Sequence, residues 1–326
     1  MRLTLILCLL TAALFVVSLV TGPADIGVME SLKALLWDDG GPVTLVMREI
    51  RLPRALLAAM IGASLGLAGA AMQGYLRNPL AEPGLIGVSG SAALGAILAM
   101  YTGAAAAFAL ALPLAALVGA LVGVGLLVAL AGPRGTSLTL ILAGIAIAAL
   151  AAAISSLVLN LSPNPYAANE IVFWMMGSLA DRSMTHFWLA LPFTLAGWAL
   201  LAGLGRGLDA LTLGEDAARA MGIGIDRLRL TVVLGTALVV GSATAVAGSI
   251  GFVGLVVPHI LRPLVGAHPS RLLWASGLGG AAMVLAADIM VRVILPARDL
   301  KLGVLTALVG APLFLHLILK LRRERI

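Results

Sequence analysis

Apolar segments recur along almost the whole chain, and this pattern limits the possible folds more than any other feature. Each segment approaches the length of about 20 residues that an α-helix needs to cross a bilayer. Of the 326 residues, 61% are hydrophobic and only 11% are charged, which exceeds the apolar content that a soluble core requires. The sequence therefore predicts an all-α, polytopic membrane protein that forms one transmembrane domain over residues 1–326.

Ten of these segments are predicted to span the membrane. They lie at about 1–21, 53–74, 86–103, 108–131, 138–160, 187–204, 228–247, 251–265, 272–293 and 303–319. The prediction for 251–265 is the weakest, because this segment is short and contains proline, histidine and arginine. Residues 1–21 also have the character of a secretory signal, but we find no convincing cleavage site and interpret them as the first span. A helix that ends at Trp37 is expected to lie in the membrane interface.

An even number of spans places both ends of the chain on one side of the membrane. If that side is the cytoplasm, it holds thirteen of the 21 lysines and arginines, in agreement with the excess of positive charge in cytoplasmic loops. Most of the remaining cations form two outer clusters, Lys33 with Arg48, Arg51 and Arg54, and Arg292 with Arg298 and Lys301. An acidic partner outside the membrane would explain these clusters. Arginines that reach from helix ends to the interface are the alternative.

The longest strongly polar interval between apolar segments is predicted to contain a short amphipathic helix at about 213–222. Apolar residues four apart share one face, acidic residues occupy the first turn, and an arginine and a glycine stand near the end. They are Leu213, Ala217 and Met221 on the face, Glu215 and Asp216 in the first turn, and Arg219 and Gly222 near the end. This spacing fits both a docking element and a solvated loop helix.

The residues that carry chemistry do not form a catalytic pattern. The four histidines lack metal-ligand spacing, and the chain has no G-x-x-x-x-G-K-[ST] phosphate loop. We therefore predict no enzymatic activity, and any work that the protein does would take its energy from a partner or an ion gradient. An ion-driven carrier usually has ionisable residues deep in several spans. Here Asp288 is nearly alone at such a depth, and its position four residues before Arg292 predicts an intrahelical ion pair.

Two runs of small residues, 62–70 and 241–248, are each followed by a polar break that contains proline. Inverted or parallel internal repeats are common in transporters, so these runs are consistent with an internal duplication. Close packing of helices in lipid, which small residues permit, explains the glycines equally well.

Short motifs follow one another from residue 51 to residue 320. They are Arg51–Arg54, Gly62–Ser64, Gln73, Arg77–Gly84, Gly87–Ser89, Leu142–Gly144, Phe173–Leu179, Leu213–Gly222, Gly248–Arg262, Ala287–Asp288, Arg292 and Gly310–Pro312. In this order they resemble the FecCD family, the permease subunits of ATP-driven importers for iron-siderophores, haem and vitamin B12. The chain departs from the family in Asp299–Gly303, where Lys301 replaces a proline, which affects the expected geometry of the last outer turn.

The resemblance implies a ten-helix permease of the type II ABC importer class. Such a permease works as a homodimer in the bacterial inner membrane, with both termini in the cytoplasm. Its expected partners are a second copy of itself, two cytoplasmic ABC ATPases, a periplasmic or lipid-anchored substrate-binding protein and membrane lipid, with no nucleic acid. The chain itself would need no cofactor or metal, because ATP and magnesium bind to the ATPase. A secondary transporter or channel without an ATPase is the alternative function.

The resemblance also implies three functional sites. The predicted helix at 213–222 matches the coupling helix that docks on the ATPase, and its residues are Leu213, Gly214, Glu215, Ala217, Ala218, Arg219, Met221 and Gly222. A cytoplasmic gate on the transport pathway would involve Asn78, Pro79, Leu80, Ser137 and Leu138, although an ordinary proline-rich turn also fits the first three. The binding protein would present carboxylates to Arg51, Arg54 and Arg292.

Overall fold

The computed structural model describes residues 2–24, 26–37, 39–108, 110–132, 135–162, 165–294 and 300–323. Within these ranges every regular element is a helix. The longer helices are α1 (Arg2–Val20), α4 (Leu52–Leu76), α5 (Val88–Tyr101), α7 (Ala111–Ala131), α8 (Ser137–Asn160), α9 (Pro165–Met175), α10 (Met184–Ala202), α13 (Ile225–Ala247), α15 (Pro269–Ile294) and α16 (Leu302–Arg323). The shorter ones are α2 (Val28–Leu36), α3 (Pro42–Leu45), η1 (Val46–Arg51), η2 (Pro83–Ile86), α6 (Ala104–Ala107), α11 (Gly205–Leu211), α12 (Glu215–Ala220), α14 (Val253–Leu261) and η3 (Pro263–Val265).

Among the described residues, seven helical stretches are long and apolar enough to cross a membrane. They are α1, the continuous stretch Pro42–Leu76 that contains α4, and α7, α8, α10, α13 and α15. The helices α5 and α16 add shorter apolar stretches. Each of these nine helices coincides with a predicted span.

The tenth predicted span, 251–265, contains a shorter helix than the other nine. Its helix α14 has nine residues, which corresponds to about 14 Å at a rise of 1.5 Å per residue. This is about half of the hydrocarbon core, which is about 30 Å thick. An irregular segment, residues 248–252, precedes α14 and begins with Gly248 at a φ of 72°. Non-helical backbone at membrane depth is tolerated when protein surrounds it.

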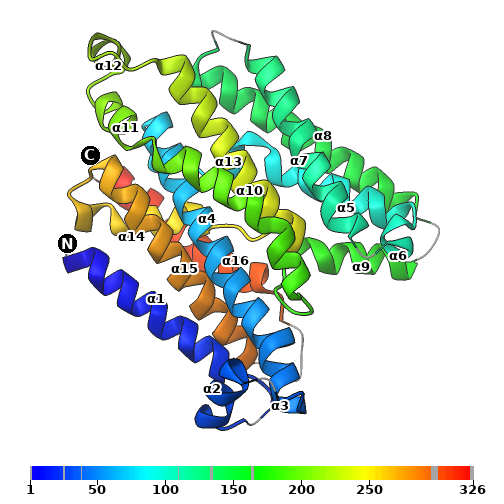
Figure 1. Ribbon diagram of the computed structural model, residues 1–326. Helices are drawn as coiled ribbons and strands as arrows, with labels where there is room; N and C mark the ends of the chain where they lie inside the picture. The colour runs from blue at the N-terminus through cyan, green and yellow to red at the C-terminus, as the bar shows by residue number, and fades with distance from the viewer. Residues whose placement is uncertain are drawn as a thin grey trace.

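Helix α4 forms the centre of the molecule, with α15 packed along it and α1 on the outside (Figure 1). Glycines allow α4 and α15 to approach each other closely. A methyl group on Gly66 would lie 1.9 Å from the carbonyl oxygen of Ser276, and one on Gly62 would lie 2.3 Å from that of Gly280. Larger side chains cannot occupy these positions, so this small-residue run serves helix packing.

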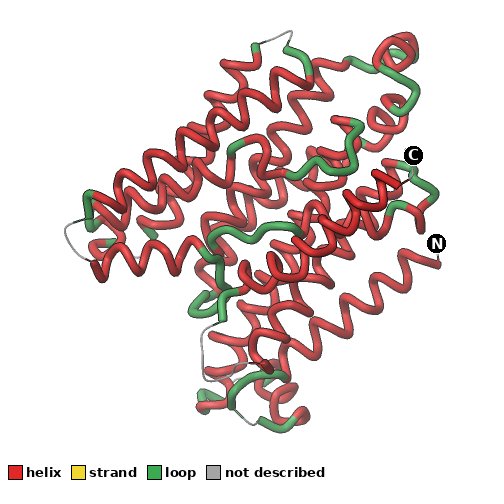
Figure 2. The backbone as a smooth tube through the Cα atoms, turned by 180° about the vertical axis from the view of Figure 1, so that it is seen from behind, coloured by secondary structure: helices red, strands yellow, loops and turns green. Residues whose placement is uncertain are grey.

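The start of α1 and the end of α16 lie at the same end of the molecule as α11 and α12 (Figures 1 and 2). The helices α2 and α3 lie at the opposite end. The described ends of α1 and α16 therefore lie on the same side of the bundle. This arrangement places the predicted coupling helix and the predicted outer arginines at opposite ends of the helical bundle.

Candidate functional site

Helix α11 attaches the polar interval to two long helices of the bundle, α13 and α15. The Asp209 carboxylate accepts a hydrogen bond of 2.9 Å from the backbone N–H of Ser270, at the start of α15, where an acidic group is favourable. Leu208 and Leu211 are buried in the core. A methyl group on Gly207 would lie 2.8 Å from Leu228 of α13. Helix α11 is therefore fixed to both α13 and α15.

Helix α12 follows directly and spans residues 215–220. Arg219 pairs with Glu215 and with Asp216, in both cases at 3.2 Å. The predicted C-terminal cap is present, because Gly222 has a φ of 81° and donates to the carbonyl of Arg219 at 2.9 Å. The N–H of Ile223 donates to the carbonyl of Ala218 at 3.0 Å, which completes a Schellman motif. These bonds keep a very short helix in one conformation.

The apolar face of this segment is uncovered in the single chain. Leu213 is 70% exposed and Met221 is 52% exposed, and Ala217 between them is partly exposed. Ala218, which the resemblance places in the docking surface, is instead fully buried in the core of the helical bundle. Neighbouring residues of a helix point about 100° apart, so Ala217 and Ala218 occupy different faces. The candidate docking surface is therefore formed by Leu213, Ala217 and Met221.

At the opposite end, two of the predicted docking arginines bind the end of α1. Arg51 is 3% exposed, and it donates to the carbonyls of Leu19, Val20 and Ala24 at 3.2, 3.1 and 2.6 Å. Arg292 donates to the carbonyls of Ser18 and Thr21 at 2.9 and 2.7 Å. The last carbonyls of a helix have no partner inside it, and cations there are favourable. Both arginines thus cap α1.

The third arginine, Arg54, completes a buried ionic cluster. Asp288 is fully buried and binds Arg54 from α4 and Arg292 from its own helix, each at 2.9 Å. The predicted ion pair between Asp288 and Arg292 is confirmed, whereas the sequence did not indicate its second partner. The three arginines lie together, but they are not the exposed charges that we expected. Contact with a binding protein remains a prediction, and Arg54, whose side chain is 17% exposed, is the best placed for it.

Three of the predicted gate residues, Asn78, Pro79 and Leu80, follow directly after the end of α4. Arg77 ends that helix with a φ of 48°, and the side chain of Asn78 accepts a 3.0 Å hydrogen bond from the N–H of Leu80. Pro79 and Leu80 are partly exposed and Asn78 is exposed. This is an ordered turn, and its role as a gate remains a prediction.

The other two gate residues begin α8. Leu138 is exposed, and Ser137 contacts Tyr75 near the end of α4. Gly144 allows α8 to pack closely against η2. A methyl group at this position would lie 2.1 Å from the carbonyl oxygen of Leu85, so a larger residue would not fit. The structure therefore brings the two predicted gate segments to the same end of the bundle.

Two polar side chains that belong to the family motifs, but to which the sequence analysis assigned no role, hold the interrupted helix α14. Pro258 has no N–H and leaves the carbonyl of Gly254 without its helical donor. The side chain of Gln73 donates to the carbonyls of Gly254 and Leu255 at 3.4 and 3.3 Å. Its oxygen accepts a hydrogen bond of 2.8 Å from Arg262. The sequence placed Gln73 among the family motifs but did not indicate these partners.

The second of these side chains is Glu82, in the break that follows α4. Its carboxylate accepts a hydrogen bond of 2.9 Å from the backbone N–H of Phe252. Phe252 has a φ of 67° and immediately precedes α14, so the carboxylate lies at the positive end of this helix. The irregular segments 77–82 and 248–252 are thus joined to each other.

Comparison with known proteins agrees with this architecture. The model of the FecCD transport family matches residues 9–320. The chain belongs to this family. No three His, Cys, Asp or Glu side chains gather as a metal site would require in the part of the chain that the structure describes.

Two relatives and one solved structure illustrate the similarity. The vitamin B12 import system permease protein BtuC of Vibrio cholerae is 40% identical over 274 residues, which cover 83% of this chain and 82% of BtuC. The hemin transport system permease protein HmuU of Yersinia pestis is 34% identical over 326 residues, covering 96% of this chain and 95% of HmuU. An inward-facing metal-chelate type ABC transporter has a TM-score of 0.87 at 33% identity and covers 98% of this chain and 99% of its own. The resemblance inferred from the motifs is confirmed, and the fold is that of an ABC importer permease.

Proposed function

We propose that this chain is the membrane-spanning subunit of an ATP-driven importer and that it carries a metal chelate into the cytoplasm. The family match over residues 9–320 supports a transport role. Relatives named for vitamin B12 and hemin, together with a structural neighbour of metal-chelate type, support the substrate class.

The exposed apolar face of α12 is the observation that carries this proposal. Leu213 and Met221 expose large apolar side chains on either side of the capped helix α12, next to Arg219, which is already paired with two carboxylates. The preceding helix α11 is fixed to α15 through Asp209. Because α11 is fixed in this way, a movement of α12 would be transmitted through α11 to α15. An ion-driven carrier has no need for such a platform, so we infer that a cytoplasmic ATPase binds it.

The opposite end of the bundle carries the charge that an acidic binding protein would recognise. Arg54 and Arg292 bind the carboxylate of Asp288, and Arg51 lies near enough to Arg292 for their charges to interact. Three arginines and one carboxylate give the cluster an excess of two positive charges. Their field acts beyond the residues that contact one another directly. Complementary charge mainly increases the rate of association and sets orientation. We propose that the binding protein approaches this end with its acidic residues.

Reconstitution of the permease in proteoliposomes tests the proposed function. The permease is combined with an ATPase and a binding protein encoded beside it, and uptake of cobalamin, hemin and a ferric siderophore is measured. We expect uptake of one of these chelates that requires ATP and both partners. Uptake driven by a proton or sodium gradient without the ATPase would contradict the proposal and favour a secondary transporter.

A further inference from the structure

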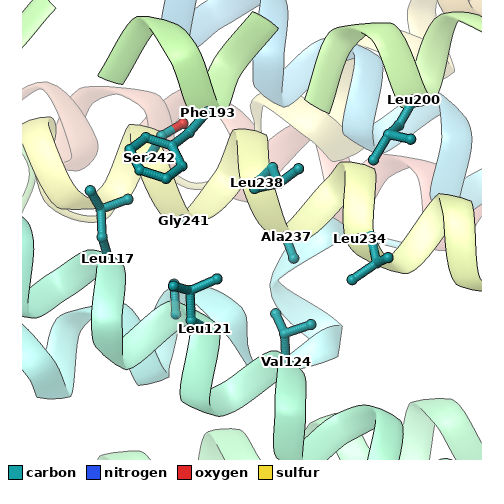
Figure 3. A pocket seen from close by; sticks show the side chains of 11 residues that line it. Leu117, Leu121, Val124, Phe193, Leu200, Leu234, Ala237, Leu238, Gly241 and Ser242 are labelled. Atoms are coloured by element: carbon teal, nitrogen blue, oxygen red, sulfur yellow. The ribbon is translucent and has the colours of Figure 1, made fainter. Parts of the chain in front are cut away.

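Two hollows follow the same pair of helices, α7 and α13. The first has a volume of about 520 Å³ and lies at the end of the bundle that carries α12; its lining includes Leu127, Val128, Leu140, Leu230, Val233 and Arg227. The second has a volume of about 140 Å³ and lies deeper. In Figure 3, Leu121 and Val124 of α7 face Leu234, Ala237 and Gly241 of α13 across it. The lining residues of the two hollows follow one another along both helices, and we call the whole the α7–α13 furrow.

The length of the α7–α13 furrow matches one leaflet of a membrane. Arg227 and Gly241 are 14 residues apart in α13, which corresponds to about 21 Å along the helix axis. One leaflet contributes about 15 Å of hydrocarbon to a bilayer core of about 30 Å. The remaining length lies where α7 ends and α13 begins, at the level of the lipid headgroups. The furrow therefore extends from the headgroup level to about the middle of the membrane.

The width of the α7–α13 furrow and the residues that line it indicate which kind of molecule can bind there. A helix with its side chains is about 10 Å across, which is far too wide for the inner hollow of about 140 Å³. The walls of that hollow are aliphatic apart from Phe193 and Ser242. A flexible hydrocarbon chain fits such a space, whereas a second protein segment does not.

The outer end of the α7–α13 furrow is positively charged. Arg227 lines it and is exposed. Arg229 is held there by the carbonyl oxygens of Gly132 and Gly135 and lies 3.5 Å from Asp226. Two arginines and one aspartate give an excess of one positive charge, which complements the single negative charge of a phosphodiester headgroup. Basic pockets between membrane helices are a known way of binding anionic lipid headgroups.

We propose that the α7–α13 furrow binds one anionic phospholipid, with an acyl chain between α7 and α13 and the headgroup phosphate at Arg227. The inference depends on the membrane location of the family and on these side chains. It does not depend on the identity of the transported chelate. Because α12 precedes α13 by only four residues, the lipid would lie beside the proposed ATPase platform.

Native mass spectrometry of the purified permease, with phosphatidylglycerol or phosphatidylcholine added, tests this inference. We expect wild-type protein to retain one phosphatidylglycerol per chain and to prefer it over phosphatidylcholine. Arg227→Gln should weaken retention of phosphatidylglycerol by about tenfold, the effect of losing one charge-assisted contact. Arg206→Gln is the matched control, since Arg206 is an exposed arginine in α11 outside the furrow. Equal binding of both lipids by wild type and Arg227→Gln would overturn the proposed headgroup site.

A second pair of variants tests the acyl chain separately. Leu234→Trp fills the inner hollow, and Leu121→Trp narrows it from the exposed side of α7. Both should reduce retention of either lipid, while Leu150→Trp, at an exposed position of α8, should not. If Leu234→Trp fails to fold, Leu121→Trp still decides the matter, and unchanged retention would refute the furrow.

Thermal unfolding distinguishes a lipid from a free phosphate. A ligand that binds only the folded state raises the melting temperature, so phosphatidylglycerol should stabilise wild type and Arg206→Gln more than Arg227→Gln. Glycerol phosphate has the headgroup chemistry without the acyl chains and should give no comparable shift. A shift as large as that of the lipid would overturn the proposal of a bound phospholipid.

Discussion

At the scale of single residues, the decisive feature is the burial of charge. Asp288 is fully buried between Arg54 and Arg292. Arg51 and Arg292 also donate hydrogen bonds to backbone carbonyls at the end of α1. Buried ions are tolerated only when each of them has partners, and removal of one partner costs far more than the pair contributes. The cluster therefore joins α1, α4 and α15 only as long as all of its members are present.

The variant Asp288→Asn tests this cluster. The substitution removes the only carboxylate that the structure places between Arg54 and Arg292, and it should reduce the stability of the folded state by about 3–5 kcal/mol. Thermal unfolding in detergent measures the effect. Asp226→Asn is the control, because that side chain is 78% exposed and its removal should change stability by less than about 1 kcal/mol. Similar melting temperatures for both variants would show that the buried cluster is not important for stability.

The buried amide of Gln73 leads to a second prediction. The change Gln73→Leu leaves the carbonyls of Gly254 and Leu255, and the guanidinium of Arg262, without this partner. Leaving buried polar groups unsatisfied costs about 1–3 kcal/mol. The variant should lose this much stability in denaturation experiments and should expose α14 to faster hydrogen exchange. Asn160→Leu, which changes an exposed amide in α8, is expected to alter neither, and protection of α14 in the Gln73 variant would contradict its assigned role.

At the scale of elements, α12 combines a rigid attachment with an uncovered apolar face. Its two ends are fixed by Gly214 and Gly222, both with positive φ, and Ala218 fixes its inner side in the core. This leaves Leu213 and Met221 pointing away from the permease. Substitutions on the exposed face of α12 should therefore weaken binding to a partner. Substitutions on its buried face should destabilise the permease itself.

The variant Leu213→Asp should weaken the complex with the ATPase while the permease stays folded. Loss of a central apolar contact and burial of a charge should cost about 2 kcal/mol or more, or roughly 30-fold in affinity. Co-purification and affinity measurements with the ATPase detect this loss. Leu264→Asp serves as the control, since Leu264 is an exposed leucine in η3.

Ala218→Arg provides the contrast to that experiment. Because Ala218 is fully buried, the arginine would force charge into the core, and the permease itself should lose its monodisperse elution in size-exclusion chromatography. A well-folded Ala218→Arg permease that only fails to bind the ATPase would mean that this side of α12 faces the partner after all.

At the scale of the whole molecule, the two ends of the bundle have different surfaces. Figure 1 shows α12 at one end and α2 and α3 at the other. The first end carries the exposed side chains of Leu213 and Met221. The second carries the cluster of Arg51, Arg54 and Arg292, which begins where η1 follows α3. The buried position of the arginines means that they act on a partner mainly through their field. Fields of this kind are weakened by salt, with a screening length of about 8 Å at physiological ionic strength.

Association with the binding protein should therefore slow as the salt concentration rises. Stopped-flow or surface-based measurements of the association rate should show a steeper salt dependence for wild type than for Arg54→Gln. Arg2→Gln, an exposed arginine at the opposite end, is the control and should behave as wild type. An association rate that does not respond to salt would exclude electrostatic recognition at this end.

The sequence by itself determined the class of the protein, the position of most helices and the family. Helices inside a bilayer must satisfy their own backbone hydrogen bonds and must match its thickness, so local composition is enough to find α4, α8 or α13 to within a few residues. The cap at Gly222 and the pair between Asp288 and Arg292 were also predictable, because residues three to five positions apart determine both.

Only the tertiary structure decided which of these residues face inward and which groups they meet. Arg292 binds Ser18, 274 residues away, and Gln73 binds the carbonyl of Gly254, 181 residues away. Pro258 indicates that the helical hydrogen bonding of α14 is interrupted, but it does not indicate which side chains replace the missing donor. Likewise, Ala218 looks equivalent to Ala217 until α12 is packed on the core. Partners so distant in the chain are selected by the packing of whole helices, and no local pattern of residues encodes that packing.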